Sequence, residues 1–143
     1  APVAQDPELS SLAWSLALGK EEVEKALDFI TKSVAEEVRK MMADPAKHVT
    51  FSLVLNKTKK GKIFVCELVM HAHQHPTFGW SYCVGLQSDV TKEVSVAELI
   101  HAALHGGYDE LVKSQRAFMQ RRVANLGLSS AQGVRYLHEK AGE

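Results

Sequence analysis

The sequence predicts an α+β domain with two N-terminal helices, a three-stranded antiparallel meander and three C-terminal helices. Apolar residues recur at spacings of three and four before residue 44 and again after residue 94, which is the period of an amphipathic helix. Between these regions the period falls to two, as expected for half-buried strands. Short polar or glycine-containing segments separate the alternating runs, so neighbouring strands are expected to pair antiparallel.

The length and composition favour one domain over residues 1–143. Of its 143 residues, 45% are hydrophobic and 24% are charged, which is enough to bury a single sizeable core. The 17 Lys and Arg residues balance the 17 Asp and Glu residues. This balance argues against a generic coat for DNA or anionic membranes, because such surfaces need a large excess of cations.

The two cysteines and the lack of long apolar runs bear on the cellular setting. Two cysteines are too few for a disulfide framework, and no apolar run approaches the roughly 20 residues of a membrane-spanning helix. Strand parity places Cys66 on the core face of the sheet and Cys83 on the outer face. We expect no membrane partner, and the composition favours a soluble, intracellular protein while leaving the compartment open.

Two helices are expected at the N-terminus, at about residues 7–18 and 20–43. Asp6 can cap the first helix, and Gly19 can end it in a left-handed conformation. The second helix carries one apolar stripe, formed by Val23, Leu27, Ile30, Val34, Val38 and Met41. Pro45 cannot continue a helix, so the second helix is expected to end before it.

Three strands are expected at about residues 48–56, 62–72 and 79–87. The sequence NKTKKGK and the turn residues Pro76 and Gly79 separate them. Three strands alone leave one mixed face uncovered, and four apolar side chains are assigned to it, namely Val54, Ile63, Val65 and Val69. We therefore predict an interface there, unless the C-terminal helices cover that face.

Three helices are expected after the sheet, at about residues 95–105, 108–126 and 129–140. Ser95 and Glu98 fit a capping box, in which both side chains satisfy free amides at a helix start. Glycines end the first two of these helices. The order of helices and strands is shared by many small α+β proteins, so it does not by itself indicate a function.

The function favoured by these patterns is a non-catalytic protein–protein interaction module, or a small subunit of a larger assembly. Its partner would be another protein or a second copy of the chain. No P-loop, dinucleotide-binding or nucleophile-elbow motif occurs. Glu67 has apolar neighbours on its strand face and lies four residues before His71. The two side chains could form an acid–base pair. One such pair is thin evidence, so the sequence favours a protein that is not an enzyme.

One alternative is a DNA-binding regulator that uses a helix-turn-helix-like pair at the C-terminus. A helix ending at Gly127 would be followed by a second short helix. Gln132 and Arg135 would then reach base edges, with Arg121 and Arg122 near phosphates. The small residue Ala124 and the glycine Gly133 fall at positions that differ from the usual motif. A helical hairpin without DNA-binding function explains the same residues.

A second alternative is a histidine-based metal-binding protein or metalloenzyme. His71 and His73 alternate along a strand, and His101 and His105 are four apart on a helix, so each pair shares a side. Imidazole is a common ligand of zinc, copper and nickel. We expect no cofactor unless the two pairs converge, in which case zinc is the candidate.

Overall fold

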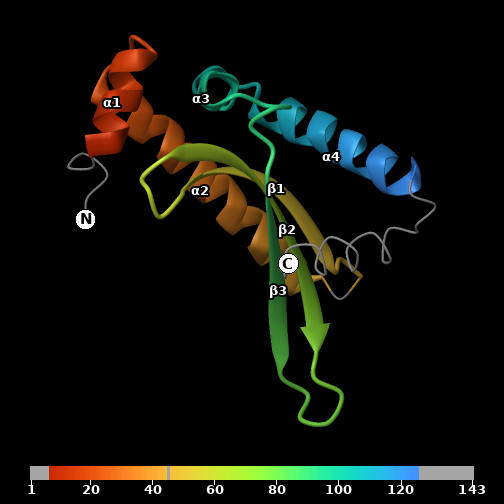
Figure 1. The fold of residues 1–143 in the computed structure, drawn as a ribbon. Coiled ribbons are helices and arrows are strands. Elements are labelled where there is room, and N and C mark those ends of the chain that lie inside the picture. The colour runs from red at the N-terminus through yellow and green to blue at the C-terminus, as the bar shows by residue number, and fades with distance from the viewer. Residues whose placement is uncertain (1–6, 45, 126–143) are drawn as a thin grey trace.

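A computed structural model describes residues 7–44 and 46–125 (Figure 1). The elements in chain order are α1 (Pro7–Ser15), α2 (Lys20–Ala43), β1 (Val49–Lys57), β2 (Ile63–Gln74), β3 (Ser81–Asp89), α3 (Val96–His105) and α4 (Tyr108–Asn125). The α+β class and the three-stranded antiparallel sheet, in the order β1-β2-β3, are confirmed. Four helices are described instead of the five expected, because the helix predicted at 129–140 lies outside the described residues.

Local sequence accounts for the helix ends. Ser95 accepts a hydrogen bond from the backbone N–H of Glu98 at 3.1 Å, as the capping box predicts, and Gly106 ends α3 with φ of 84°. The end of α1 differs from the prediction. Ala17, at φ 56°, takes the left-handed conformation, and Gly19 is instead the extended N-cap of α2.

The β2–β3 hairpin is longer than the rest of the sheet. β1 pairs with β2 from Val49 opposite His71 onwards, and the backbone N–H of Ala72 still donates to the His48 carbonyl at 2.7 Å. From His73 onwards the described pairing of β2 is with β3 alone. The hairpin continues past the strand ends, because the backbone N–H of His75 donates to the carbonyl of Trp80 at 2.7 Å. Figure 1 shows this end of the hairpin projecting away from all four described helices.

Helices contact both faces of the sheet. On the Glu67 face, α4 reaches the sheet through the Gln115 amide, which donates to the Glu67 carboxylate at 3.3 Å. On the opposite face, the sulfur atoms of Met42 in α2 and Cys83 in β3 lie 3.8 Å apart. The register also places Cys66 on this second face, so the expectation that the two cysteines occupy opposite faces is wrong. Both thiols are free.

The Tyr108 hydroxyl fastens the start of α4 to the outer edge of β1. It donates to the carbonyl oxygen of Leu53 at 2.8 Å, and both residues are buried. Burial raises the pKa of Tyr108 to about 12, so the phenol stays a donor. A carbonyl on an unpaired strand edge needs such a partner once it is buried.

Tyr108→Phe should therefore lower the free energy of unfolding by about 1.5 kcal/mol, because it leaves the buried Leu53 carbonyl without a donor. Urea denaturation measures this loss, and the slope of the transition should stay unchanged. Phe29→Leu is the matched control, since it removes the ring that meets Tyr108 edge-on but keeps this hydrogen bond. A Tyr108→Phe variant as stable as the wild type would show that the hydroxyl contributes nothing.

Candidate interaction surface

The projecting hairpin carries a continuous row of rings on one face. His71, His73 and Tyr82 share this face because His73 lies opposite Tyr82 in the register. The backbone pairing of His75 with Trp80 extends the same face toward the turn. Successive ring centroids are 4.4 Å apart for His71–His73, 5.3 Å for His73–Tyr82, 5.2 Å for Tyr82–Trp80, 4.7 Å for Trp80–His75 and 4.9 Å for His75–Phe78. We call these six residues the ring row.

The ring row is open to solvent. The exposed fractions are 74% for Phe78, 51% for Trp80 and 39% for Tyr82. Aromatic side chains are enriched where proteins dock on one another, because each buries a large apolar area at a small entropic cost. Three such exposed rings on one hairpin face therefore indicate a contact surface.

The projecting part of the hairpin is also free of formal charge. Residues 68–88 contain no Asp, Glu, Lys or Arg, although such residues make up 24% of the chain. Exposed edge strands usually carry lysine or another charge that blocks pairing with a second chain. Here β3 is an edge strand of the described sheet and carries no charged residue before its last one, Asp89. Charge depletion of this kind is typical of the centre of a protein interface.

The first two histidines of the row interact directly. His71 Nδ1 and His73 Nε2 lie 2.9 Å apart, so one nitrogen donates and the other accepts. Burial lowers the pKa of His71, and the neighbouring His73 and His48 lower it further. This contact therefore requires at least one neutral imidazole.

The structure does not bring the four predicted metal ligands together. His71 and His73 lie on β2, whereas His101 and His105 stack on the exposed side of α3 with ring centroids 5.6 Å apart. Within residues 7–44 and 46–125, no group of three His, Cys, Asp or Glu side chains is placed to hold a metal ion. The structure thus places the two histidine pairs on different elements, and zinc binding by them stays a prediction.

The four residues of the predicted interface do not form one exposed group. Val54 pairs with Cys66 and so lies on the opposite face from Ile63, Val65 and Val69. Val65 and Val69 are buried. These side chains are buried because α4 covers the sheet face that carries Glu67. The prediction had allowed for this case, in which a C-terminal helix lies on that face.

Glu67 is held by α4 and not by His71. Its carboxylate accepts from Gln115 at 3.3 Å and from Arg122 at 3.2 Å, and it is only 1% exposed. Burial raises the pKa of Glu67, which the hydrogen bond from Gln115 and the charge of Arg122 partly offset. Arg122 also lies 3.8 Å from a carboxylate oxygen of Glu93. This network anchors α4 on the sheet.

The same network bears on the predicted nucleic-acid site. Arg122 is engaged with Glu67, whereas its neighbour Arg121 is exposed. Gln132 and Arg135 lie outside the described residues. Of the two predicted contacts that lie within the described residues, Arg121 is the exposed cation.

Sequence reasoning missed the ring row, although its signal is present. His71 and His73 were considered only as metal ligands, and His75 continues their alternation along the chain. A hairpin centred on residues 77–78 would have placed these histidines opposite Trp80, Tyr82 and Val84. The absence of charge across the same residues was a second signal.

Comparisons with protein-family models, with curated proteins and with solved structures find no match for this chain. Among the residues that the structure describes, no helix has both the length and the apolar character needed to cross a membrane. The function must therefore be argued from the surface itself.

Proposed function

We propose that the chain is a protein-interaction module whose β2–β3 hairpin docks on a second copy of the same chain. The observation that carries this proposal is the ring row, which lies exposed on a hairpin without formal charge. The contact would cover the row and add the edge of β3 to its counterpart. Such a small subunit acts by binding and not by catalysis.

The stability of the hairpin supports a partner. A two-stranded hairpin standing alone is marginally stable in water, because it buries little apolar surface. Within residues 7–44 and 46–125, the base of the projecting part meets the His48 carbonyl and Met42 of α2, whereas no third strand pairs with it from His73 onwards. A second protein surface would supply burial that the described residues do not provide there.

The chemistry of the hairpin favours a second copy as that partner. An uncharged surface is matched best by another uncharged surface, since an unpaired charge buried against it would lose its hydration. The hairpin of a second copy is such a surface. An edge strand that pairs antiparallel with its own copy satisfies two-fold symmetry, which is the commonest symmetry of protein dimers.

The absence of cations argues against nucleic acid at this surface. Proteins that stack bases on aromatic rings also hold the phosphate backbone with Lys or Arg. Residues 68–88 contain neither. Exposed rings without cations fit a protein contact better than a contact with single-stranded DNA or RNA.

Sedimentation velocity of the purified full chain tests the proposal. We expect a reversible monomer–dimer equilibrium near pH 7.5, and Tyr82→Glu should shift it to monomer by placing a charge in the ring row. His105→Glu, which places a charge on exposed α3, is the matched control and should leave the dimer unchanged. A wild-type chain that stays monomeric up to about 0.5 mM would contradict the proposal.

Self-association should weaken as the pH falls. Protonation of His71 places a positive charge in the otherwise uncharged ring row, where burial and the neighbouring His73 and His48 disfavour it. The fold lowers the pKa of His71, so the folded chain binds this proton less readily than the unfolded chain does. The free energy of unfolding therefore falls as the pH drops below the pKa of a free imidazole. The dimer dissociation constant should rise roughly tenfold between pH 7.5 and 5.5.

Equilibrium sedimentation at the two pH values measures this change. His73→Gln should reduce the pH dependence because it leaves a neutral side chain beside His71. His101→Gln, in the stacked pair on α3, should leave it intact. Equal pH dependence in the two variants would show that the proton acts elsewhere.

A further inference from the structure

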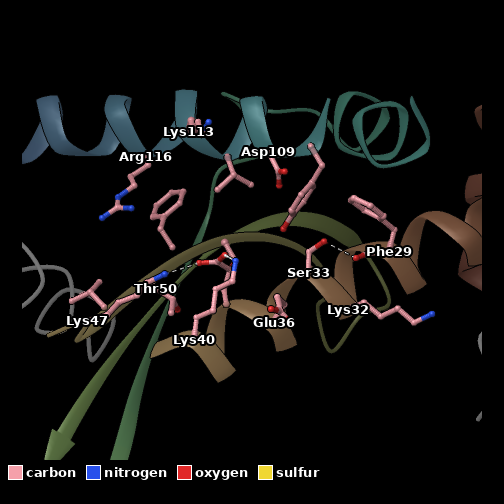
Figure 2. Close-up of a pocket in the computed structure, with 16 residues that line it drawn as sticks. Phe29, Lys32, Ser33, Glu36, Lys40, Lys47, Thr50, Asp109, Lys113 and Arg116 are labelled. Carbon is pink, nitrogen blue, oxygen red and sulfur yellow. Dashed lines mark hydrogen bonds and ion pairs between the residues drawn. The ribbon is translucent and has the colours of Figure 1, made fainter. Parts of the chain in front are cut away.

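A second site lies on the opposite edge of the sheet from the projecting hairpin's β3 strand. A partly open cavity of about 680 Å³ is enclosed by α2, β1 and α4 (Figure 2). This volume is in the range of sites for small molecules. We propose that this cavity binds a small organic anion with an aromatic body.

The charges around the cavity favour an anion. Five cationic side chains line it against three carboxylates, and the cations are Lys32, Lys40, Lys47, Lys113 and Arg116. Glu37 holds Lys40 and Lys47, with oxygen–nitrogen distances of 3.6 Å and 3.1 Å. Lys32 pairs with Asp28 at 2.8 Å, and Lys113 pairs with Glu110 at 3.5 Å. No ion pair of Arg116 is found within residues 7–44 and 46–125. Arg116 therefore has a guanidinium fork open to a carboxylate or sulfonate.

The opposite end of the cavity is aromatic. The rings of Phe29 and Tyr108 meet edge-on with centroids 5.7 Å apart, and Phe29 is 40% exposed. In Figure 2, Phe29 lies at one end of the cavity, and Arg116 lies at the other end with Lys47 and Lys40. Tyr108 and Arg116 are eight residues apart on α4, which corresponds to roughly 12 Å along the helix. An aromatic anion of about this length would reach both ends.

The floor of the cavity offers unsatisfied polar groups. Thr50 lines it, is 2% exposed, and its hydroxyl has no hydrogen-bond partner among the described residues. The edge of β1 adds a donor. His48 accepts from β2 whereas Leu53 accepts from Tyr108, so the alternation directs the backbone N–H of Phe51 away from β2 and toward the cavity. A bound anion could accept from this N–H.

Titration of the full chain with 8-anilinonaphthalene-1-sulfonate, an aromatic anion whose fluorescence rises on binding, tests this proposal. We expect saturable binding at one site. Arg116→Glu should weaken it at least tenfold, whereas Arg121→Glu, a matched change at another exposed arginine of α4, should weaken it less than about twofold. The neutral analogue N-phenyl-1-naphthylamine should bind at least tenfold more weakly than the anion.

Two further variants test whether the anion binds in this cavity. Thr50→Val should raise the melting temperature of the free protein by about 3 °C, because it removes an unpaired buried hydroxyl. The same variant should weaken anion binding severalfold, because it removes a hydroxyl that would donate a hydrogen bond to the bound anion. Tyr82→Glu, in the ring row, should not change anion binding. Equal effects of the two arginine changes, equal binding of the neutral analogue, or no saturation below about 1 mM would overturn the proposal.

Discussion

Replacing Trp80 with glutamate should raise the dissociation constant of the proposed dimer by about 100-fold or more. Trp80 lies within the ring row, between His75 and Tyr82, and half of its surface is exposed in the single chain. The substitution removes a large apolar area and buries a carboxylate in a surface without a cation to pair with it. Sedimentation velocity over a concentration series measures the change.

The second tryptophan of the chain provides the matched control. Trp14 on α1 is 88% exposed and lies outside the hairpin. Trp14→Glu introduces the same chemical change at another exposed ring, so it should leave the dissociation constant within about twofold of the wild type. If the two variants weaken association equally, the hairpin is not the docking surface.

Replacing Arg122 with methionine should lower the free energy of unfolding by about 2 kcal/mol near pH 7. The change keeps the apolar stem of the side chain but removes the cation beside the buried carboxylate of Glu67. Arg122 is itself about a third exposed, so solvent screens the pair and the loss stays below that of a fully buried one. Urea denaturation measures the loss, and Arg121→Met on the exposed side of α4 should cost less than about 0.5 kcal/mol.

This loss should depend on pH in a specific direction. The pKa of Glu67 is raised in the fold, so the folded chain holds the proton more firmly than the unfolded chain does. The carboxyl therefore stabilises the fold most below about pH 4.5, and this contribution is lost as the pH rises through the folded pKa. Arg122 limits that loss, so the penalty of Arg122→Met should shrink as the pH falls. Adding Glu67→Gln should restore most of the stability near pH 7, because the amide needs no cation.

The sequence carried most of the information for the secondary structure. The apolar stripe of α2 is continuous over about five turns, and the polar stretch around Gly61 and the residues near Pro76 mark the two hairpin turns. These signals are local, so they could be read without knowledge of the fold. The capping residues Ser95 and Gly106 likewise act within their own helix ends.

The relation of elements to one another could not be predicted in the same way. The mixed face of β2 was expected to be open because it carries Glu67, yet Val65 and Val69 beside it are buried. A carboxylate can enter a core when a distant residue satisfies it, and here Gln115 and Arg122 come from 48 and 55 positions further along the chain. Alternation along one strand contains no information about such partners.

The candidate site was predicted less well than the fold. The alternating histidines suggested a metal, but the pairing of β2 with β3 sets them beside aromatic rings. The cavity near Thr50 depends on the spacing between α2, β1 and α4, which is a tertiary property. The uncharged stretch of residues 68–88 was visible in the sequence, and it supports the proposed docking beside the ring row.

Amide hydrogen exchange of the wild-type chain, followed by mass spectrometry at protein concentrations well below and well above the dimer dissociation constant, tests the proposed docking most directly. Peptides covering residues 73–82 should exchange quickly in the monomer, because the described pairing of this part of the hairpin is between β2 and β3 alone, and at least tenfold more slowly in the dimer. Peptides of α2 should exchange at the same rate at both concentrations. Hairpin exchange that is independent of concentration, or protection that appears on α2 instead, would contradict a dimer formed through this hairpin.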